Sequence, residues 1–86
     1  MPQISAGCGI KIYIYFEDHP PPHFHAIGGG YEVIVEISSG RVLKGSAPRT
    51  ELMRIINWGI ENGIGLADNW QNAQTGEALK ALPRIT

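Results

Sequence analysis

The sequence predicts an α+β fold in which a small antiparallel sheet of three or four strands is covered by two helices. In the first half of the chain, apolar residues alternate with polar ones, which is typical of half-buried strands. After Pro48 they recur every three or four residues, which is typical of helices. We therefore expect one domain over residues 1–86, strand-rich over 1–45 and helical over 46–86.

The longest alternating pattern predicts a strand over Ile10–Glu17, with isoleucine or phenylalanine at every second position. Pro20–Pro22 then favour a stiff extended connection, because proline has no amide hydrogen and a fixed φ. Further strands are predicted at His23–Ile27, Tyr31–Ser38 and Arg41–Gly45. Their short, glycine-containing links favour an antiparallel meander.

A first helix is predicted over Pro48–Asn62, where an apolar stripe includes Leu52, Ile55, Ile56 and Ile60. The segment Asn62–Gly65 is expected to end it, and a second helix should run from Leu66 to Thr75. The tail, Glu77–Thr86, should pack back on the body. The predicted core comprises Ile12, Ile14, Val33, Val35, Leu52, Ile55, Ile56 and Trp70.

Composition narrows the function classes. Hydrophobic residues make up 43% and charged residues 17%, so the chain is globular and not disordered. A formal net charge of −1 gives no support to a strongly basic nucleic-acid clamp. The N-terminal residues resemble neither a signal peptide nor a membrane span, and the single cysteine, Cys8, excludes an internal disulfide. We expect a cytoplasmic protein without membrane contact, with either a compact unassisted core or one supplemented by a metal or a partner chain.

All three histidines lie within seven residues, in the string Asp18-His19-Pro20-Pro21-Pro22-His23-Phe24-His25. If His23 and His25 lie on a strand, alternation places both imidazoles on one face. They could then bind one divalent ion of the zinc or nickel type, completed by His19 or by a carboxylate from Asp18 or Glu17. The candidate metal ligands are therefore His19, His23, His25 and Asp18.

Two other interpretations of the histidines stay open. Imidazoles also transfer protons near neutral pH, so His19, His23 and His25 are candidate catalytic residues of a small RNase-like hydrolase. Alternatively, their ring nitrogens could bind backbone carbonyls and serve structure alone. The residue pattern does not decide between metal binding, catalysis and structure.

Other residues carry weaker signals. The triplet Gly28–Gly30 lacks the spacing of a phosphate-binding loop and indicates a turn. Cys8 is expected to be a buried or inert thiol. Tyr13 and Tyr15 share one strand face and could form an exposed aromatic surface, while Trp58 and Trp70 should contact the helices and the core.

The motif Asp18-His19, followed by Pro21-Pro22-His23-Phe24-His25, resembles the signature of DUF4160, a family of small prokaryotic proteins of unknown function. The resemblance covers nearly the whole chain. It extends to Met1-Pro2, Ile4-Ser5, Gly9-Ile10, Tyr15-Phe16, Tyr31-Glu32, Gly40, Pro48-Arg49, Trp58, Trp70 and Gly76-Glu77. The chain departs from the family at its glycine triplet and at Gly59, Gly63 and Gly65, which leaves the length of the first helix open.

The resemblance implies a partner more than a reaction. Members of the family are often encoded beside another small protein, an arrangement like a bacterial toxin–antitoxin pair. We therefore expect a component of a two-gene module that acts through protein contacts, or else a homo-oligomer. A meander with two edge strands also invites strand addition from a second chain.

Overall fold

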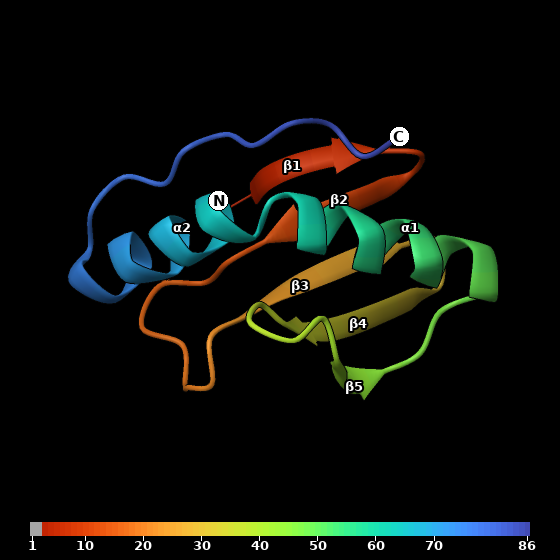
Figure 1. The fold of residues 1–86 in the computed structure, drawn as a ribbon, viewed down its shortest axis with the longest axis horizontal. Coiled ribbons are helices and arrows are strands. Elements are labelled where there is room, and N and C mark those ends of the chain that lie inside the picture. The colour runs from red at the N-terminus through yellow and green to blue at the C-terminus, as the bar shows by residue number, and fades with distance from the viewer. Residues whose placement is uncertain (1–2) are drawn as a thin grey trace.

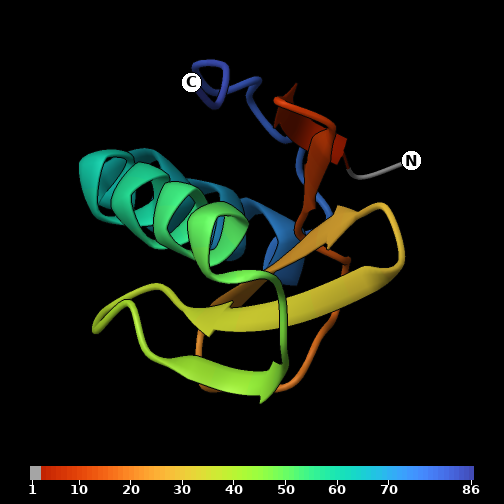
Figure 2. The same ribbon diagram turned by 90° about the vertical axis from the view of Figure 1, so that its right-hand side faces the viewer.

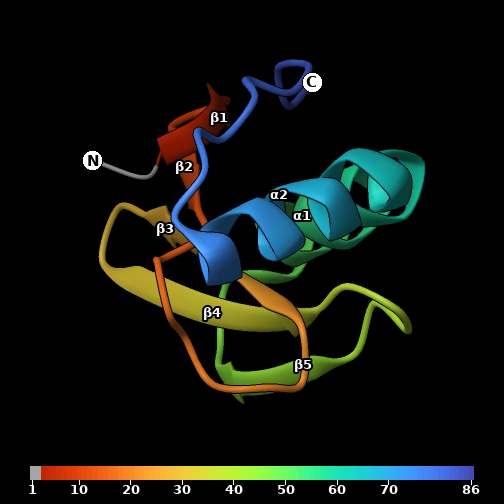
Figure 3. The same cartoon turned by 90° about the vertical axis from the view of Figure 1, so that its left-hand side faces the viewer.

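The computed structural model describes residues 3–86, which form five strands followed by two helices (Figure 1). The elements are β1 Gln3–Gly7, β2 Ile10–Tyr13, β3 His23–Gly28, β4 Tyr31–Glu36, β5 Val42–Gly45, α1 Arg49–Glu61 and α2 Gly63–Thr75. The strands form one antiparallel sheet in the order of the sequence. Figures 2 and 3 show both helices on the same side of a curved sheet. The predicted α+β fold with two helices is confirmed, but the sheet has five strands instead of three or four.

The additional strand is β1, whose sequence Gln-Ile-Ser-Ala-Gly has no clear alternation. It pairs with β2 along one edge. Its other edge is covered by the C-terminal segment, residues 77–86: the N–H of Leu82 donates to Ile4 (2.8 Å) and that of Ile85 to Ala6 (3.3 Å). One of the two sheet edges expected to be open is therefore occupied by the chain itself.

The strand predicted over Ile10–Glu17 ends at Tyr13. Ile14 is still fully buried, but Phe16 is 47% exposed and does not continue the inner face. The backbone turns away from the sheet at Glu17, which has a positive φ of 58°. There its N–H donates to the carbonyl of Ala73, near the end of α2 (3.3 Å). The contact with α2 thus holds the chain beyond the end of β2, where the loop that carries Asp18 begins.

The core lies between the helices and the inner face of the sheet. Of the eight predicted core residues, Leu52 and Ile56 are only partly buried, and the other six are buried. The buried residues that were not predicted include Phe24, Trp58, Leu66 and Ile85. Phe24 meets Trp58 edge to face, with ring centroids 5.7 Å apart, so this pair joins β3 to α1.

The helices are separated by Asn62 alone. The second helix therefore begins at Gly63 and not at the predicted Leu66. The N–H of Leu66 donates to the carbonyl of Asn62 (2.9 Å), so residues 63–65 form the first turn of α2. The glycines allow close packing: a Cβ on Gly59 would lie 3.0 Å from the Phe24 ring, and one on Gly65 would lie 2.7 Å from Leu82.

Neither helix is long and apolar enough to serve as a membrane span.

Candidate functional site

The candidate site lies at the end of the sheet where β3 begins and α2 ends. His23 and His25 are two residues apart on β3 and share a face, as alternation predicts, with ring centroids 5.2 Å apart. The loop after β2 brings Asp18 against both rings. One ligand atom from each of Asp18, His23 and His25 lies within 4.8 Å of the others.

A single oxygen of Asp18 joins the two histidines. Its Oδ2 lies 2.9 Å from Nε2 of His23 and 3.2 Å from Nε2 of His25. Its Oδ1 accepts a hydrogen bond from the backbone N–H of His19 (2.8 Å). Burial by itself raises the pKa of Asp18, but hydrogen bonds from the His19 amide and from His25 and His23 outweigh it and hold that pKa below its ordinary value. Asp18 is therefore a carboxylate at neutral pH.

The other nitrogen of each imidazole faces an oxygen acceptor. Nδ1 of His23 lies 2.7 Å from the carbonyl oxygen of Pro21, and Nδ1 of His25 lies 3.0 Å from Oε2 of Glu32. A carbonyl or carboxylate oxygen can only accept, and the Asp18 carboxylate that faces each Nε2 accepts in the same way. Both nitrogens of each ring therefore face an acceptor, whereas a neutral imidazole carries a single N–H.

The nitrogen of each ring that lacks the N–H faces its acceptor with a lone pair, and a positive charge there would make that contact favourable, since a nitrogen lone pair and an acceptor oxygen repel each other. Two species supply such a charge. One is a second proton on each ring, which would make two imidazolium ions. The other is a metal cation that takes both Nε2 atoms and Asp18 as ligands.

The surroundings hold the cluster in place. The Trp70 ring of α2 lies 5.0 Å from that of His23, and Tyr15 meets His25 edge to face at 4.6 Å. Gln74, also on α2, donates from Nε2 to the backbone carbonyl of Asp18 (3.2 Å). Burial, followed by the nearby Glu32 carboxylate, raises the pKa of Tyr15, so its phenol stays neutral.

The comparisons with known proteins place this site within a family. The family model described as a domain of unknown function, DUF4160, matches residues 9–71. The chain belongs to the DUF4160 family. The matched range holds Asp18, His23, His25, Glu32 and Trp70. Comparison with curated proteins and with solved structures gave no match.

The structure groups some of the candidate residues of this DUF4160 protein and separates others. Asp18, His23 and His25 come together. His19 is exposed and contacts Asp18 through its backbone N–H only, and Glu17 is exposed outside the group. The prediction that the proline loop brings the His19 ring to the cluster is therefore wrong, because the loop points that ring toward solvent.

Two supporting residues were missed in the sequence. Glu32 lies on β4 two positions before Ile34, which pairs with His25, so it shares the face of that histidine. The alternation of β4 and the glycine turn before it could have revealed this. Gln74 gave no such signal, because its contact with Asp18 depends on how α2 packs against the loop.

Two further expectations are corrected. Tyr13 is 6% exposed and stacks on Tyr15 with centroids 5.9 Å apart, so this strand face is not an open aromatic surface. Cys8 is exposed instead of buried, because it lies in the tight β1–β2 turn with a φ of 52°. Its Sγ lies 3.8 Å from Nη1 of Arg54, a basic neighbour that is 46 residues away in the sequence.

Proposed function

We propose that this DUF4160 protein binds a divalent transition metal ion of the zinc or nickel type through Asp18, His23 and His25. The observation that carries the proposal is the orientation of the two imidazoles. Each ring turns Nδ1 to an oxygen acceptor and Nε2 to the same oxygen of Asp18. Metal-binding histidines have this pattern, with one nitrogen on the ion and the other donating to a carbonyl or a carboxylate.

The distances between the ligand atoms also suit an ion of the zinc or nickel type. Zinc ligands lie about 2.0–2.1 Å from the metal, so neighbouring ligand atoms are roughly 3.0–3.4 Å apart. The two contacts of Asp18 Oδ2, at 2.9 and 3.2 Å, are close to that spacing, and since the three ligand atoms lie within 4.8 Å of one another, binding would draw them closer together. Imidazole and carboxylate together suit zinc, nickel, copper and iron.

The number of protein ligands is compatible with a catalytic metal site. Three protein ligands leave at least one coordination position, which in catalytic zinc sites holds water or substrate. The side chains of His25 and Asp18 are 12% and 23% exposed, so solvent reaches the cluster. Hydrolysis by a metal-activated water is therefore the reaction class to test first, and an RNase-like hydrolase stays a proposal within it.

Calorimetry tests the metal site. Protein stripped with a chelator and desalted is titrated with Zn²⁺ and, separately, with Ni²⁺. We expect one ion per chain, loss of binding in His23→Ala/His25→Ala, and wild-type affinity in the matched control His19→Ala. Equal binding by the double variant, or no binding by wild-type protein whose fold is confirmed by circular dichroism, would contradict the proposal.

We also propose that the protein contacts a small cognate protein, as in a toxin–antitoxin-like pair. Two isoleucines at the junction of α1 and α2 support this, because Ile60 is 64% and Ile64 is 85% exposed. They border a groove that is also lined by Pro22, Ile37 and Gly40, near the β4–β5 turn. Large apolar side chains gathered on a surface are typical of protein contacts.

Co-expression tests the partner. The chain is expressed with the small protein encoded beside it, and affinity purification should recover both. The variant Ile60→Ser/Ile64→Ser should no longer recover the partner. Met53→Ser is the control, because it also replaces an exposed apolar side chain of α1 (49% exposed) by serine, and it should still recover the partner. Failure to co-purify, together with no growth effect when the chain is expressed alone, would sink this proposal. Sedimentation at low micromolar concentration separates a homodimer from a monomer.

A further inference from the structure

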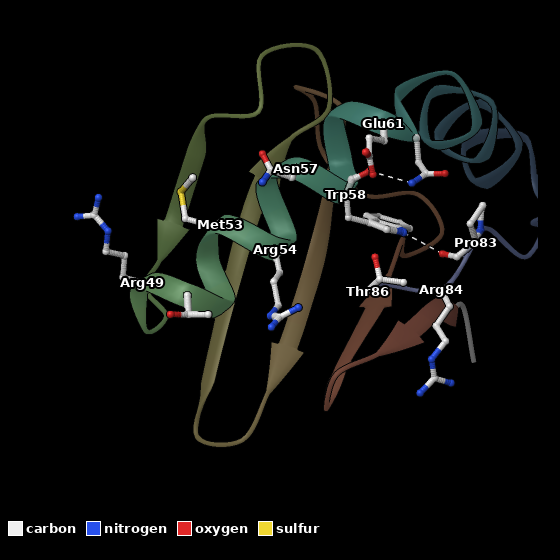
Figure 4. A pocket seen from close by; sticks show the side chains of 11 residues that line it. Arg49, Met53, Arg54, Asn57, Trp58, Glu61, Pro83, Arg84 and Thr86 are labelled. Carbon is white, nitrogen blue, oxygen red and sulfur yellow. Dashed lines mark hydrogen bonds between the residues drawn. The ribbon is translucent and has the colours of Figure 1, made fainter.

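A groove between α1 and the C-terminal segment gathers positive charge (Figure 4). It is lined by Arg49, Arg54 and Arg84, three of the seven lysines and arginines in the chain. Within residues 3–86, the ion pairs all involve histidine, so none of these arginines is paired with a carboxylate. Glu61 also lines the groove, and Figure 4 shows it apart from Arg54 and Arg84.

A hydrogen bond from the buried Trp58 joins the two sides of this groove. The indole Nε1 of Trp58 donates to the carbonyl of Pro83 (2.8 Å), and the Ser5 hydroxyl donates to the same oxygen (2.7 Å). Arg54 lies one helical turn before Trp58, and Arg84 follows Pro83 directly. The bond from Trp58 therefore holds Arg54 and Arg84 on opposite walls of one groove.

Close packing places Arg84 further. A Cβ on Gly7 would lie 2.9 Å from its Cγ, so the glycine leaves space for the stem of the arginine against β1. On the other wall, Nη1 of Arg54 reaches Cys8 Sγ in the β1–β2 turn (3.8 Å). The stem of Arg84 and the guanidinium group of Arg54 thus both lie near the turn that follows β1. Thr86 lies between the two arginines in Figure 4, and Asn57, farther along α1, also lines the groove.

The side chains that line the groove include three guanidinium groups and one carboxylate, that of Glu61, and this excess of positive charge attracts anions. The planar fork of N–H donors on a guanidinium group matches the oxygens of phosphate, and hydroxyl and amide groups add further donors. A compact anion fits better than a nucleic-acid strand, which needs an extended basic surface, because the whole chain has a formal net charge of −1.

We propose that the groove formed by Arg49, Arg54 and Arg84 binds a compact diphosphate group, free or as part of a nucleotide. The site is separate from the histidine cluster and does not depend on a metal there. Arg54 and Arg84 grip the phosphate oxygens, and Arg49, in the first turn of α1, contributes positive charge at the far end.

Calorimetry with inorganic pyrophosphate, at low ionic strength and with chelator-stripped protein, tests this inference. Arg54→Gln/Arg84→Gln should lower the affinity at least tenfold. The matched control Arg41→Gln/Lys44→Gln removes the same charge near β5 and should bind like wild type. ADP in a parallel titration distinguishes a nucleotide diphosphate from the free anion, and binding of either through Arg54 and Arg84 supports the proposal.

Three results would overturn it. The first is absence of pyrophosphate and ADP binding by wild-type protein at millimolar concentration. The second is an equal loss of affinity in the control Arg41→Gln/Lys44→Gln, which would indicate that the overall charge of the protein attracts the anion. The third is arginine-dependent binding of a single-stranded RNA oligonucleotide without binding of either diphosphate. Arg54 and Arg84 are exposed, and circular dichroism confirms that the variant keeps its fold.

Discussion

Asn69 of α2 and Lys80 of the C-terminal segment exchange two hydrogen bonds. The side-chain Nδ2 of Asn69 donates to the carbonyl of Lys80 (2.9 Å), and the N–H of Lys80 donates back to Oδ1 (2.8 Å). Asn69 is completely buried. Its amide therefore satisfies the backbone of a segment that has neither helix nor strand, and holds that segment along α2.

Replacing Asn69 should weaken this attachment. In Asn69→Ala, the backbone N–H and carbonyl of Lys80 both lose their partner, and two hydrogen bonds of about 0.5–1.5 kcal/mol each make the expected cost about 1–3 kcal/mol. The free energy of unfolding in urea measures the loss. Asn72→Ala is the control, because its amide makes one long contact of 3.4 Å with Ala78 at an exposed position. If the free energy of unfolding falls equally in the two variants, the hydrogen bonds to Lys80 contribute no more than the contact with Ala78.

The apolar stripe of α1 gives a second stability prediction. Ile55 is fully buried against the sheet, whereas Ile60 is 64% exposed on the same helix. Ile55→Ala should lower the free energy of unfolding by about 2–5 kcal/mol, because it removes buried methyl groups and leaves a cavity. Ile60→Ala makes the same chemical change at the surface and should cost far less. If both variants unfold at the same urea concentration, the assigned core is wrong.

Glu32 should tune the proposed metal site without touching the ion. Its Oε2 accepts from Nδ1 of His25 and so directs the other nitrogen toward Asp18. Loss of such a supporting contact lowers metal affinity about 10–100-fold. We expect this weakening of Zn²⁺ binding, about 10–100-fold, in Glu32→Ala but not in Glu61→Ala, which removes an exposed carboxylate from α1. Calorimetry compares the two, and unchanged affinity in Glu32→Ala would argue against this role.

Trp70 should report metal binding directly, since its ring centroid lies 5.0 Å from that of His23. In Trp58→Phe, Trp70 is the remaining indole, and we expect Ni²⁺ to quench its fluorescence in a saturable way. Adding His23→Ala to that variant should abolish the quenching. The reverse variant, Trp70→Phe, keeps Trp58 on α1 and should respond weakly. Similar quenching of both indoles would indicate collisions in solution instead of a bound ion.

Local pattern predicted much of this fold. Strand alternation located β2 and β4, the proline and glycine turns delimited β3 and β5, and helical spacing placed α1 to within one residue at each end. β1 escaped notice because Ser5, Ala6 and Gly7 carry no apolar pattern. It is held by pairing with β2 and the C-terminal segment, which no local signal records.

Local pattern likewise predicted one part of the candidate site and not the other. The short spacing of His23 and His25 on one strand placed their rings together. The choice of Asp18 over His19 depended on the path of the loop, which the N–H of Glu17 and the side chain of Gln74 fix against α2. Contacts between distant segments decide such choices, and a single sequence does not reveal them.

Tyr31 gives the last prediction, on stability in alkali. Its ring packs over Gly28, and burial, followed by the nearby Glu51 carboxylate, raises its pKa above the ordinary 10.0. The unfolded chain therefore releases this proton at a lower pH than the folded one, so the contribution of Tyr31 is complete below about pH 10 and falls as pH rises further. Tyr31→Phe cannot ionise. Urea unfolding at about pH 8 and pH 11 should show a smaller loss of stability in the variant than in wild type. Since Tyr15 is present in both proteins, an identical loss would mean that the Tyr31 phenol ionises equally in the folded and unfolded chains.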